Sequence, residues 1–238
     1  LTTVGAGGTA STVAGIPFYS ADTSSIYTTD VSGTDSTASG NSAYGYQAMD
    51  AITTGDNNTA MGFGALGANT TASSNTAVGK DALLISTTGG SNVAIGVSAL
   101  AANTTADTNV AVGALALTTN STGAANVGIG YQALEDNTTG ANNVAIGREA
   151  LEDNTTANYN VAIGGYALQK NTTGAQNIAI GGQAADANTT GTRNIAIGYT
   201  AYSASDTEND NLAIGYAAMI TNTAGGTENV AIGNYALD

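Results

Sequence analysis

Short apolar runs recur along this chain at a fixed interval, and each run begins with Asn and ends with Gly. The run reads Asn-Val-Ala-Ile-Gly in full at residues 92–96, 143–147, 160–164 and 229–233. Looser copies begin at Asn41, Asn58, Asn75, Asn109, Asn126, Asn177, Asn194 and Asn211. The spacing from one Asn to the next is 17 residues ten times in succession, and 18 residues for the last step. Such a tandem repeat predicts a stacked array in which each copy is one structural unit.

The full repeat reads Asn-Val-Ala-Ile-Gly-Tyr-x-Ala-Leu-x-x-Asn-Thr-Thr-Gly-Ala-x, with positions numbered from the first Asn. Position 5 is Gly and position 8 is Ala in all twelve copies, and position 3 is Ala in eleven. A Gly that ends every apolar run indicates a positive φ angle or a close backbone approach. The small side chains at positions 3 and 8 indicate two backbone segments that face each other across a narrow interior.

The apolar runs favour strands over helices. Segments of four or five residues that end in Gly are too short for a helix, and Val and Ile at positions 2 and 4 suit a pleated surface. The Asn-Thr-Thr-Gly stretch that follows is typical of turns. The sequence therefore predicts an all-β fold, a β-solenoid (parallel β-roll) of twelve 17-residue coils over residues 41–238. We expect two short strands in each coil, at positions 2–5 and at about 7–10.

Residues 1–40 lie outside the repeat and contain no Asn. Their one apolar island, residues 13–19, includes Pro17, the only proline of the chain. Because proline cannot donate a hydrogen bond to a strand ladder, we expect an edge strand or an extended arm at this point. Two roles stay open for the segment: a cap over the end of the stack, or an assembly arm that pairs with another subunit.

Strand alternation predicts an apolar stripe on one face of the solenoid. Because Ala at position 3 fits the narrow interior, the side chains at positions 2 and 4 should point the other way. A Val/Ile stripe of that length is too large to stay exposed on a soluble monomer, so we expect self-association along it, most simply around a three-fold axis. The alternative is that Val and Ile fill the roll and Ala faces out. The members of this assembly stripe are Val93, Ile95, Val144, Ile146, Val161, Ile163, Ile178, Ile180, Ile195 and Ile197.

A second Asn column occupies position 12 of the repeat. Seven of its members precede Thr-Thr or Ser-Thr and so form Asn-x-Ser/Thr acceptor sequences. The column is interpreted either as a ladder of turn residues or as an exposed edge that carries sugars in a secreted protein. The candidate glycosylation residues are Asn69, Asn103, Asn120, Asn137, Asn154, Asn171 and Asn188.

Composition argues against several functions. The 238 residues include no His and no Cys, which excludes Ser-His-Asp and Cys-His nucleophiles and imidazole or thiolate metal sites. A net charge of −14 disfavours nucleic acid and anionic membranes as partners. No apolar run approaches the ~18 residues that a membrane span needs. We expect no enzyme, no catalytic residues and no cofactor.

One acidic group is a calcium candidate. Glu135 and Asp136 occupy the same repeat positions as Glu152 and Asp153 in the next coil. Stacking would bring the four carboxylates together, and such oxygen ligands suit Ca²⁺ or, in principle, acid–base catalysis. The alternative is a solvated edge. Residues 62–67 match the G-x-G-x-x-G dinucleotide pattern without its strand and helix context. The Thr-Thr columns resemble ice-binding arrays without their Thr-x-Thr strand face.

The repeat resembles the head-domain repeat of trimeric autotransporter adhesins. It is also similar to head-like repeats in bacteriophage tail and neck fibres, where Asn-x-Ala-Ile/Val-Gly-Tyr-x-Ala-Leu is common. The resemblance covers residues 41–238 and is specific in the first five positions of the repeat. It implies a left-handed parallel β-roll, three chains packed side by side, and a surface fibre that adheres to host molecules. Each coil of this chain is longer by an Asn-Thr-Thr-Gly turn, and the heptads of a coiled-coil stalk are absent.

Together these features predict a non-enzymatic structural subunit of an extracellular fibre or filament, exposed at a cell or virion surface. We expect an adhesin-like homo-oligomer, either a trimer or a head-to-tail polymer. In the polymer, the arm of another subunit would complete the last coil, which stops at Asp238. The alternative is a receptor-binding or shaft segment of a bacteriophage tail fibre. That segment would bind a surface glycan or host receptor through exposed residues, for instance Tyr131, Arg148, Tyr166, Tyr199, Tyr202 and Tyr216.

Overall fold

The computed structural model describes residues 11–13, 16–18, 26–27, 37–203, 207–220 and 226–237. Within these ranges every regular element is a β-strand. The chain divides into two compact units, the first ending at Val112 and the second beginning at Gly113. The division falls inside the coil that begins at Asn109, so it does not coincide with a repeat boundary.

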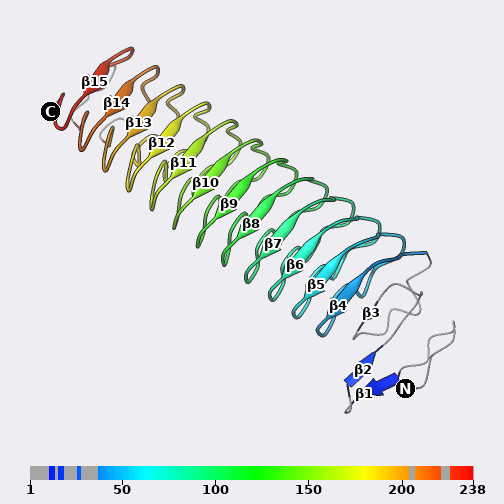
Figure 1. Ribbon diagram of the computed structural model, residues 1–238. Helices are drawn as coiled ribbons and strands as arrows, with labels where there is room; N and C mark the ends of the chain where they lie inside the picture. The colour runs from blue at the N-terminus through cyan, green and yellow to red at the C-terminus, as the bar shows by residue number, and fades with distance from the viewer. Residues whose placement is uncertain are drawn as a thin grey trace. The chain divides into compact units, whose positions relative to one another are not determined.

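The first unit contains a short hairpin and a series of parallel strands (Figure 1). Its strands are β1 (Ser11–Val13), β2 (Ile16–Phe18), β3 (Ile26–Tyr27), β4 (Ser42–Tyr44), β5 (Thr59–Met61), β6 (Thr76–Val78), β7 (Val93–Ile95) and β8 (Val110–Val112). β1 and β2 are antiparallel, with Thr12 opposite Pro17, as a proline in a two-stranded pair allows. From β3 onward each strand pairs in parallel with the next along the chain.

The sheet of the first unit begins before the first repeat Asn. β3 lies within residues 1–40 and pairs with β4, so that Ile26 is opposite Ser42. The N–H of Ile26 donates to the carbonyl of Asn41 at 2.8 Å, and the Tyr27 side chain is fully buried. Most of residues 1–40 lie outside the described residues, so their role as cap or assembly arm stays a prediction.

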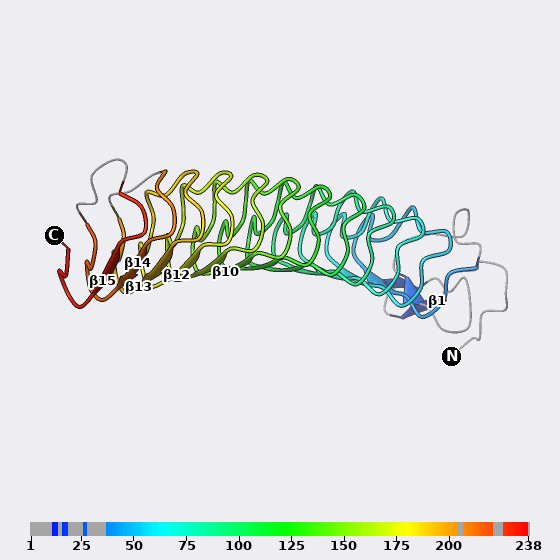
Figure 2. The ribbon, with the colours of Figure 1, turned by 90° about the horizontal axis from the view of Figure 1, so that it is seen from above.

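The second unit repeats one strand per coil. Its strands are β9 (Val127–Ile129), β10 (Val144–Ile146), β11 (Val161–Ile163), β12 (Ile178–Ile180), β13 (Ile195–Ile197), β14 (Leu212–Ile214) and β15 (Val230–Ile232). Pairing is parallel and in register, so that equivalent residues of neighbouring coils stand opposite each other, as Ile146 does with Ile163. Within each unit the strands lie along one side of the coils and the turns along the other (Figure 2).

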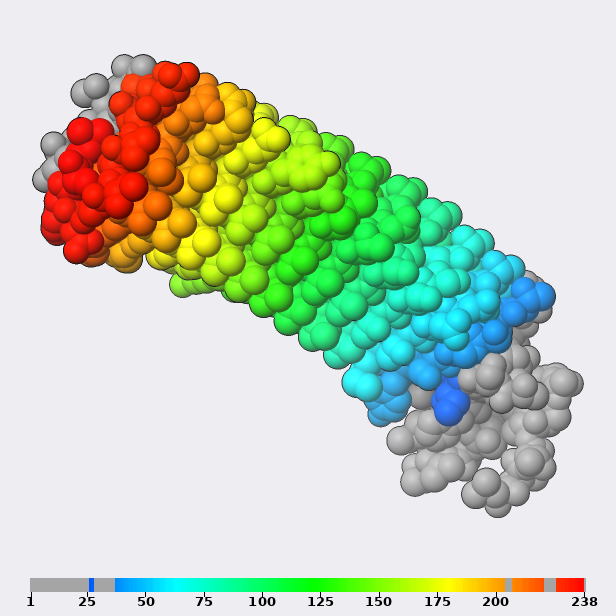
Figure 3. All heavy atoms as spheres, turned by 45° about the horizontal axis from the view of Figure 1, so that its top comes forward, coloured from blue at the N-terminus to red at the C-terminus, as the bar shows by residue number. Residues whose placement is uncertain are grey.

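The predicted repeat register is confirmed. Each of the twelve strands from β4 to β15 begins directly after a repeat Asn, as β4 does after Asn41 and β15 after Asn229. The prediction of an all-β solenoid with a coil of about 17 residues is therefore confirmed as well. In the space-filling view, successive coils of each unit lie against one another as parallel bands (Figure 3).

The prediction of a second strand at positions 7–10 is wrong. Residues at positions 7 and 9 have left-handed φ angles, for instance 63° at Tyr166 and 51° at Leu168. The Ala167 N–H turns back to the Gly164 carbonyl of its own coil at 3.3 Å, while the Leu168 N–H donates to the Ala184 carbonyl of the next coil at 3.0 Å. These linked turns are held by hydrogen bonds between coils, which stabilise backbone conformations that non-glycine residues rarely adopt.

The interior is narrow and consists mainly of Ala, Leu and Asn side chains. Ala162 at position 3, Ala167 at position 8 and Leu168 at position 9 are all fully buried. The same holds for nearly every described copy of these positions, which confirms the predicted close approach of two backbone segments. Because Ala loses no side-chain entropy on burial, folding a thin interior of this kind has a small entropy cost for its side chains.

The first Asn of each coil ties that coil to the next. The Asn160 Nδ2 donates to the Gly174 carbonyl of its own coil at 2.8 Å. Its Oδ1 accepts the backbone N–H of Asn177, the equivalent residue in the next coil, at 2.9 Å. The same pair of bonds recurs at Asn58 and Asn143, among others. These Asn side chains are almost completely buried, so each satisfies backbone groups that water does not reach.

Candidate functional site

The outer face of the sheet carries the assembly stripe. In β10, Ala145 is buried while Val144 is half-buried and Ile146 is 37% exposed. The stripe residues of the other strands follow the same pattern, so their side chains face outward, as strand alternation predicts. The alternative interpretation, in which Val and Ile fill the roll, is wrong, because the fully buried Ala side chains occupy that interior.

In-register pairing turns the stripe into columns of like side chains. Val144 stands opposite Val161, and Ile146 stands opposite Ile163. No charged residue occupies positions 2 or 4 in any strand from β4 to β15. The outer face is therefore apolar or uncharged in both units, while the described Asp, Glu, Lys and Arg side chains lie outside the strands. A surface that exposes such columns is typical of a contact with another apolar surface.

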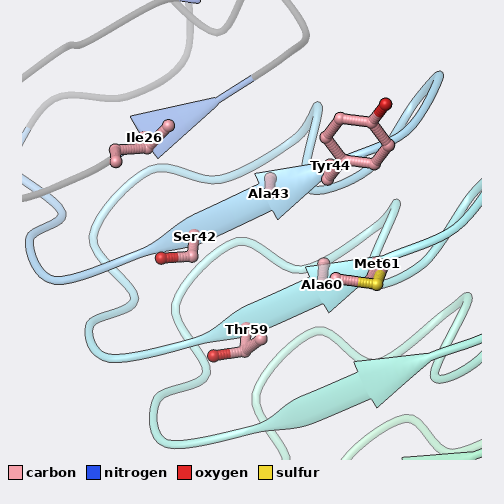
Figure 4. Close-up of a pocket in the computed structure, with 7 residues that line it drawn as sticks. All are labelled: Ile26, Ser42, Ala43, Tyr44, Thr59, Ala60 and Met61. Carbon is pink, nitrogen blue, oxygen red and sulfur yellow. The ribbon is translucent and has the colours of Figure 1, made fainter.

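The character of this face changes in the first coils. At β4 and β5 the outward residues are Ser42, Tyr44, Thr59 and Met61. Together with Ile26 they line a shallow pocket of about 170 Å³, and Tyr44 and Met61 are each more than half exposed (Figure 4). In the first unit, the position-4 column of Val and Ile thus begins at Val78 of β6, and the position-2 column begins at Val93 of β7.

The position-12 Asn residues form a buried ladder. All seven candidate glycosylation residues, Asn69, Asn103, Asn120, Asn137, Asn154, Asn171 and Asn188, are 0% exposed. The Nδ2 of Asn154 donates to the Oδ1 of Asn137 at 2.8 Å and to the Ala157 carbonyl at 3.3 Å. Because a glycan would replace a hydrogen of this nitrogen, the folded coil has no space for it. The prediction of a sugar-bearing edge is contradicted, and the interpretation as a ladder describes the column.

The four calcium candidates do not form a metal site. Among the described residues, no group of three or more acidic side chains is placed to hold a metal ion. Glu135 accepts a hydrogen bond from Gln132, and Glu152 accepts one from Gln169 at 2.7 Å. Amide groups thus occupy carboxylate oxygens that a cation would need. The calcium prediction for Glu135, Asp136, Glu152 and Asp153 is therefore contradicted by the arrangement of these side chains.

Burial and neighbouring carboxylates nevertheless raise the pKa values of two of these acidic side chains, Glu152 and Asp153. Burial raises the pKa of Glu152. The carboxylates of Glu149, Asp153 and Glu135 raise the same pKa further, while the hydrogen bond from Gln169 lowers it. The pKa of Asp153 is likewise raised, mainly by burial. Burial and repulsion between carboxylates therefore make Glu152 and Asp153 bind protons more readily in the folded state than in the unfolded chain.

We expect the protein to become more stable as the pH falls from neutral. Glu152, Asp153 and Asp186 have raised pKa values in the folded state, so their destabilising effect is complete above those values and is relieved as they protonate. Asp210, whose pKa the hydrogen bond from Arg193 lowers, acts in the opposite direction. Thermal unfolding between about pH 4 and pH 7 checks the sign.

Glu152→Gln provides the matched comparison for this pH dependence. The amide keeps the shape of the side chain and still offers an oxygen to Gln169. We expect a higher Tm at neutral pH and a weaker dependence of Tm on pH. A Tm that drops on acidification in the unsubstituted protein, or a pH dependence that Glu152→Gln leaves unchanged, would show that these carboxylates do not oppose folding.

The structure separates the predicted receptor-contacting residues. Tyr131, Tyr199 and Tyr216 are 46%, 50% and 45% exposed. Tyr202 is fully buried, and its hydroxyl accepts a hydrogen bond from Asn211 at 2.8 Å, so its inclusion among surface residues is wrong. Its place in the coil is position 9, which is buried in every coil except the last, where Leu237 is 43% exposed.

Arg148 is held between two aromatic rings. Its guanidinium carbon lies 5.9 Å from the centre of the Tyr131 ring and 5.6 Å from that of Tyr166. The Nε of Arg148 also donates to the Oε1 of Glu149 at 2.7 Å. The resulting patch combines an exposed cation with two aromatic rings, while the carboxylate of Glu149 lies largely buried beside it; a cation between rings can recognise polar ligands.

Stacked aromatic pairs were not predicted from the sequence. Tyr46 and Phe63 stack with their ring centres 5.7 Å apart, and Tyr199 and Tyr216 stack at the same distance. All four residues occupy position 6 of their coils. The usable signal was the occurrence of aromatic residues at one repeat position in two successive coils, because parallel stacking places such residues next to each other.

No protein family, no curated protein sequence and no solved structure matches this chain. Among the described residues, no helix is long and apolar enough to cross a membrane. The G-x-G-x-x-G pattern at residues 62–67 lies in the turns that follow β5, with no helix after it.

Proposed function

We propose that this protein is a non-enzymatic structural subunit of an extracellular fibre or filament, at a cell or virion surface. In this proposal, copies of the chain pack side by side through the assembly stripe. The observation that supports it is the outward-facing set of Val and Ile columns on an uncharged sheet face. Covering such a face with another apolar surface lowers the free energy, because apolar side chains leave contact with water.

The repeat suits a side-by-side contact. On the sheet face, each coil from β7 onward offers two partly exposed apolar side chains, such as Val161 and Ile163, so the gain from a single coil is small. In-register stacking adds these gains along each unit without adding a charge that must lose its water. The chain has a net charge of −14, and none of the charged residues that the structure describes lies on the Val/Ile face, so charge repulsion opposes contacts through the remaining surface. Copies of the chain should therefore associate through the assembly stripe and not through the rest of the surface.

The resemblance to trimeric adhesin heads suggests how many copies meet. Three parallel chains around a common axis would bring the same stripe of each chain to the centre. This arrangement closes the assembly, because each stripe is fully covered and no further copy can join. A head-to-tail polymer through residues 1–40 would instead extend without limit. The two assemblies differ in the masses they produce.

Native mass tests the proposal. We expect sedimentation of the intact protein to give three times the 23.2 kDa chain mass. Replacing two stripe residues, Ile146→Lys together with Ile163→Lys, should weaken association by roughly 100-fold or more. Burying an unpaired charge costs several kcal/mol, and about 1.4 kcal/mol corresponds to tenfold in affinity.

Thr139→Lys together with Thr156→Lys is the matched control for these substitutions. Both threonines are exposed in turns, so the same two charges are added away from the sheet face. The control should keep the mass of the unsubstituted protein. A protein that sediments as a single chain at all concentrations would contradict the proposal, and an unlimited series of masses would favour head-to-tail polymerisation.

The exposed aromatic edge favours a second candidate, a receptor-binding segment of a bacteriophage tail fibre. The Arg148 patch between Tyr131 and Tyr166 is the observation behind it. An array of surface glycans would test it, with Tyr131→Ala and Arg148→Ala as variants that should lose the signal. If no glycan binds, or if binding survives both substitutions, this candidate fails while the structural role stands.

A further inference from the structure

Three tyrosines come together at an exposed edge of the second unit. Tyr199 and Tyr216 stack with ring centres 5.7 Å apart and an angle of 17° between the rings. Tyr235 meets Tyr216 edge-on, with ring centres 5.3 Å apart. All three side chains are between 45% and 56% exposed, so reagents in solution can reach them. Tyr216 lies between the other two and contacts both.

The composition of the chain directs oxidation towards tyrosine. There is no Cys, Trp or His, and 11 Tyr and three Met are present. Met49 and Met219 are fully buried, which leaves Met61 as the exposed thioether. Thiols, where present, are oxidised readily and can be cross-linked as disulfides. Without them, exposed phenols are the side chains of this chain that oxidation can join by a covalent bond.

We propose that Tyr216 is an oxidative cross-linking site that couples to the tyrosine ring of a neighbouring coil. The oxidant is a peroxide, used by a peroxidase that removes one electron and one proton from each of two phenols. The two phenoxyl radicals join through ring carbons next to the hydroxyl groups. The hydrogen on each joined carbon then moves to the phenol oxygen, which restores both rings. The peroxide takes up the two electrons and two protons and leaves as two water molecules.

The contact between the rings makes this coupling local. The 5.7 Å separation of the Tyr199 and Tyr216 rings is a stacked contact, so radicals formed on both need only a small side-chain rotation to react. Tyr216 follows Tyr199 by 17 residues, so the bond would join adjacent coils and close a loop of one repeat. A closed loop of this kind restricts the unfolded chain, as a disulfide does. The cross-link would reinforce a stack that has no cysteine.

The first unit supplies an internal comparison. Tyr46 and Phe63 stack at the same distance of 5.7 Å and with an angle of 29° between the rings. They are 70% and 47% exposed, comparable to the tyrosines of the second unit. Because Phe63 has no hydroxyl group, it cannot give a phenoxyl radical under these conditions. The Tyr46–Phe63 pair has similar stacking geometry to the Tyr199–Tyr216 pair but contains one phenol instead of two. Comparing the two pairs therefore shows whether stacking is enough for coupling or whether two phenols are required.

The test treats the dilute full-length protein with horseradish peroxidase and hydrogen peroxide. Dityrosine is detected by its blue fluorescence, and the linked peptides are identified by mass spectrometry after proteolysis. We expect a product of single-chain mass that has lost two hydrogen atoms and links Tyr216 to Tyr199 or to Tyr235. Oxidation at Met61 adds an oxygen atom and is distinguished by that gain of mass.

Two substitutions make opposite predictions. Tyr216→Phe should abolish the linked peptides of the second unit, since Tyr199 and Tyr235 lie on either side of it. Phe63→Tyr should create a new linked peptide with Tyr46. Tyr159→Phe removes a 61% exposed tyrosine outside the stacked pairs and should change neither. Circular dichroism confirms that each variant keeps its fold.

Several results would overturn the inference. Intrachain dityrosine that persists in Tyr216→Phe would place the site elsewhere. Dityrosine found only between chains, or dominated by Tyr159, would show that exposure rather than stacking selects the partners. Absence of dityrosine in the unsubstituted protein, with Met61 oxidised in the same sample, would show that the stacked rings do not couple. A Phe63→Tyr variant that forms no dityrosine with Tyr46 would likewise show that stacked tyrosine rings do not couple.

Discussion

Replacing Gly164 with Ala is expected to lower the stability of the protein by roughly 2–6 kcal/mol, the sum of a backbone penalty and a steric clash. Gly164 has a φ angle of 134°, in a region that residues with a side chain rarely occupy. A Cβ at this position would lie 2.5 Å from the carbonyl oxygen and 2.6 Å from the carbonyl carbon of Gly181 in the next coil. Both atoms belong to the backbone, so neither can move aside without disturbing the stack.

The neighbouring residue provides the control. Gly165→Ala places a Cβ whose nearest neighbour, the Arg148 carbonyl oxygen, is 3.9 Å away, and Gly165 does not have a positive φ. This substitution should leave stability unchanged or raise it slightly, because Ala restricts the unfolded chain. Urea unfolding of both variants checks the difference. Equal midpoints for Gly164→Ala and Gly165→Ala would mean that the coils do not approach as closely as the structure shows.

Replacing Asn160 with Ala should cost about 1.5–4.5 kcal/mol, the sum of about 1–3 kcal/mol for a buried N–H left unsatisfied and about 0.5–1.5 kcal/mol for one lost hydrogen bond to a carbonyl. The Asn177 N–H loses its side-chain acceptor at 2.9 Å, while the Gly174 carbonyl loses the donor at 2.8 Å and keeps a second donor, Asn171 Nδ2, at 2.9 Å. Asn160 is 0% exposed, so bulk water does not reach the groups that lose these hydrogen bonds. Thermal or urea unfolding measures the loss.

Asn160→Asp tests the same contacts through pH. A carboxylate can accept from the Asn177 N–H but cannot donate to the Gly174 carbonyl, and its charge would be buried. Burial raises the pKa of such a carboxyl, so the loss of stability should be complete at neutral pH and partly reversed on acidification, when the protonated group can donate. Asn158→Ala is the control, because Asn158 is half-buried and accepts one hydrogen bond, from the Ala141 N–H at 2.7 Å. A loss at Asn158 as large as that at Asn160 would contradict the proposed role of the buried Asn.

Repetition made the first half of each coil predictable. The strict 17-residue spacing sets where each strand begins, and Ala at position 3 decides which face is interior. Strand alternation then places Val161 and Ile163 outside, where the structure has them. These faces are predictable because successive side chains of a strand point to opposite faces, and the small Ala differs clearly in size from the Val and Ile on either side of it.

The second half of the coil was not predictable in the same way. Leu134 and Leu168 adopt φ angles of 55° and 51°, although Leu carries no local signal for left-handed backbone. Hydrogen bonds from the neighbouring coils impose this conformation, and they exist only after stacking. The Asn-x-Ser/Thr sequences suggested exposed glycosylation sites because turn residues usually lie at the surface. In the structure, hydrogen bonds between neighbouring coils hold Asn154 in the interior, and these bonds also exist only after stacking.

The absence of cysteine allows a direct measurement of which face forms the contact between copies. Ile163→Cys places one thiol on the assembly stripe, and Thr156→Cys places one in the exposed turn. If parallel copies pack through the stripe, a short bis-maleimide should join two chains of the Ile163→Cys protein into a covalent dimer on a denaturing gel. The Thr156→Cys protein should stay as single chains. Single chains for Ile163→Cys, or a dimer only for Thr156→Cys, would contradict packing through the Val/Ile face.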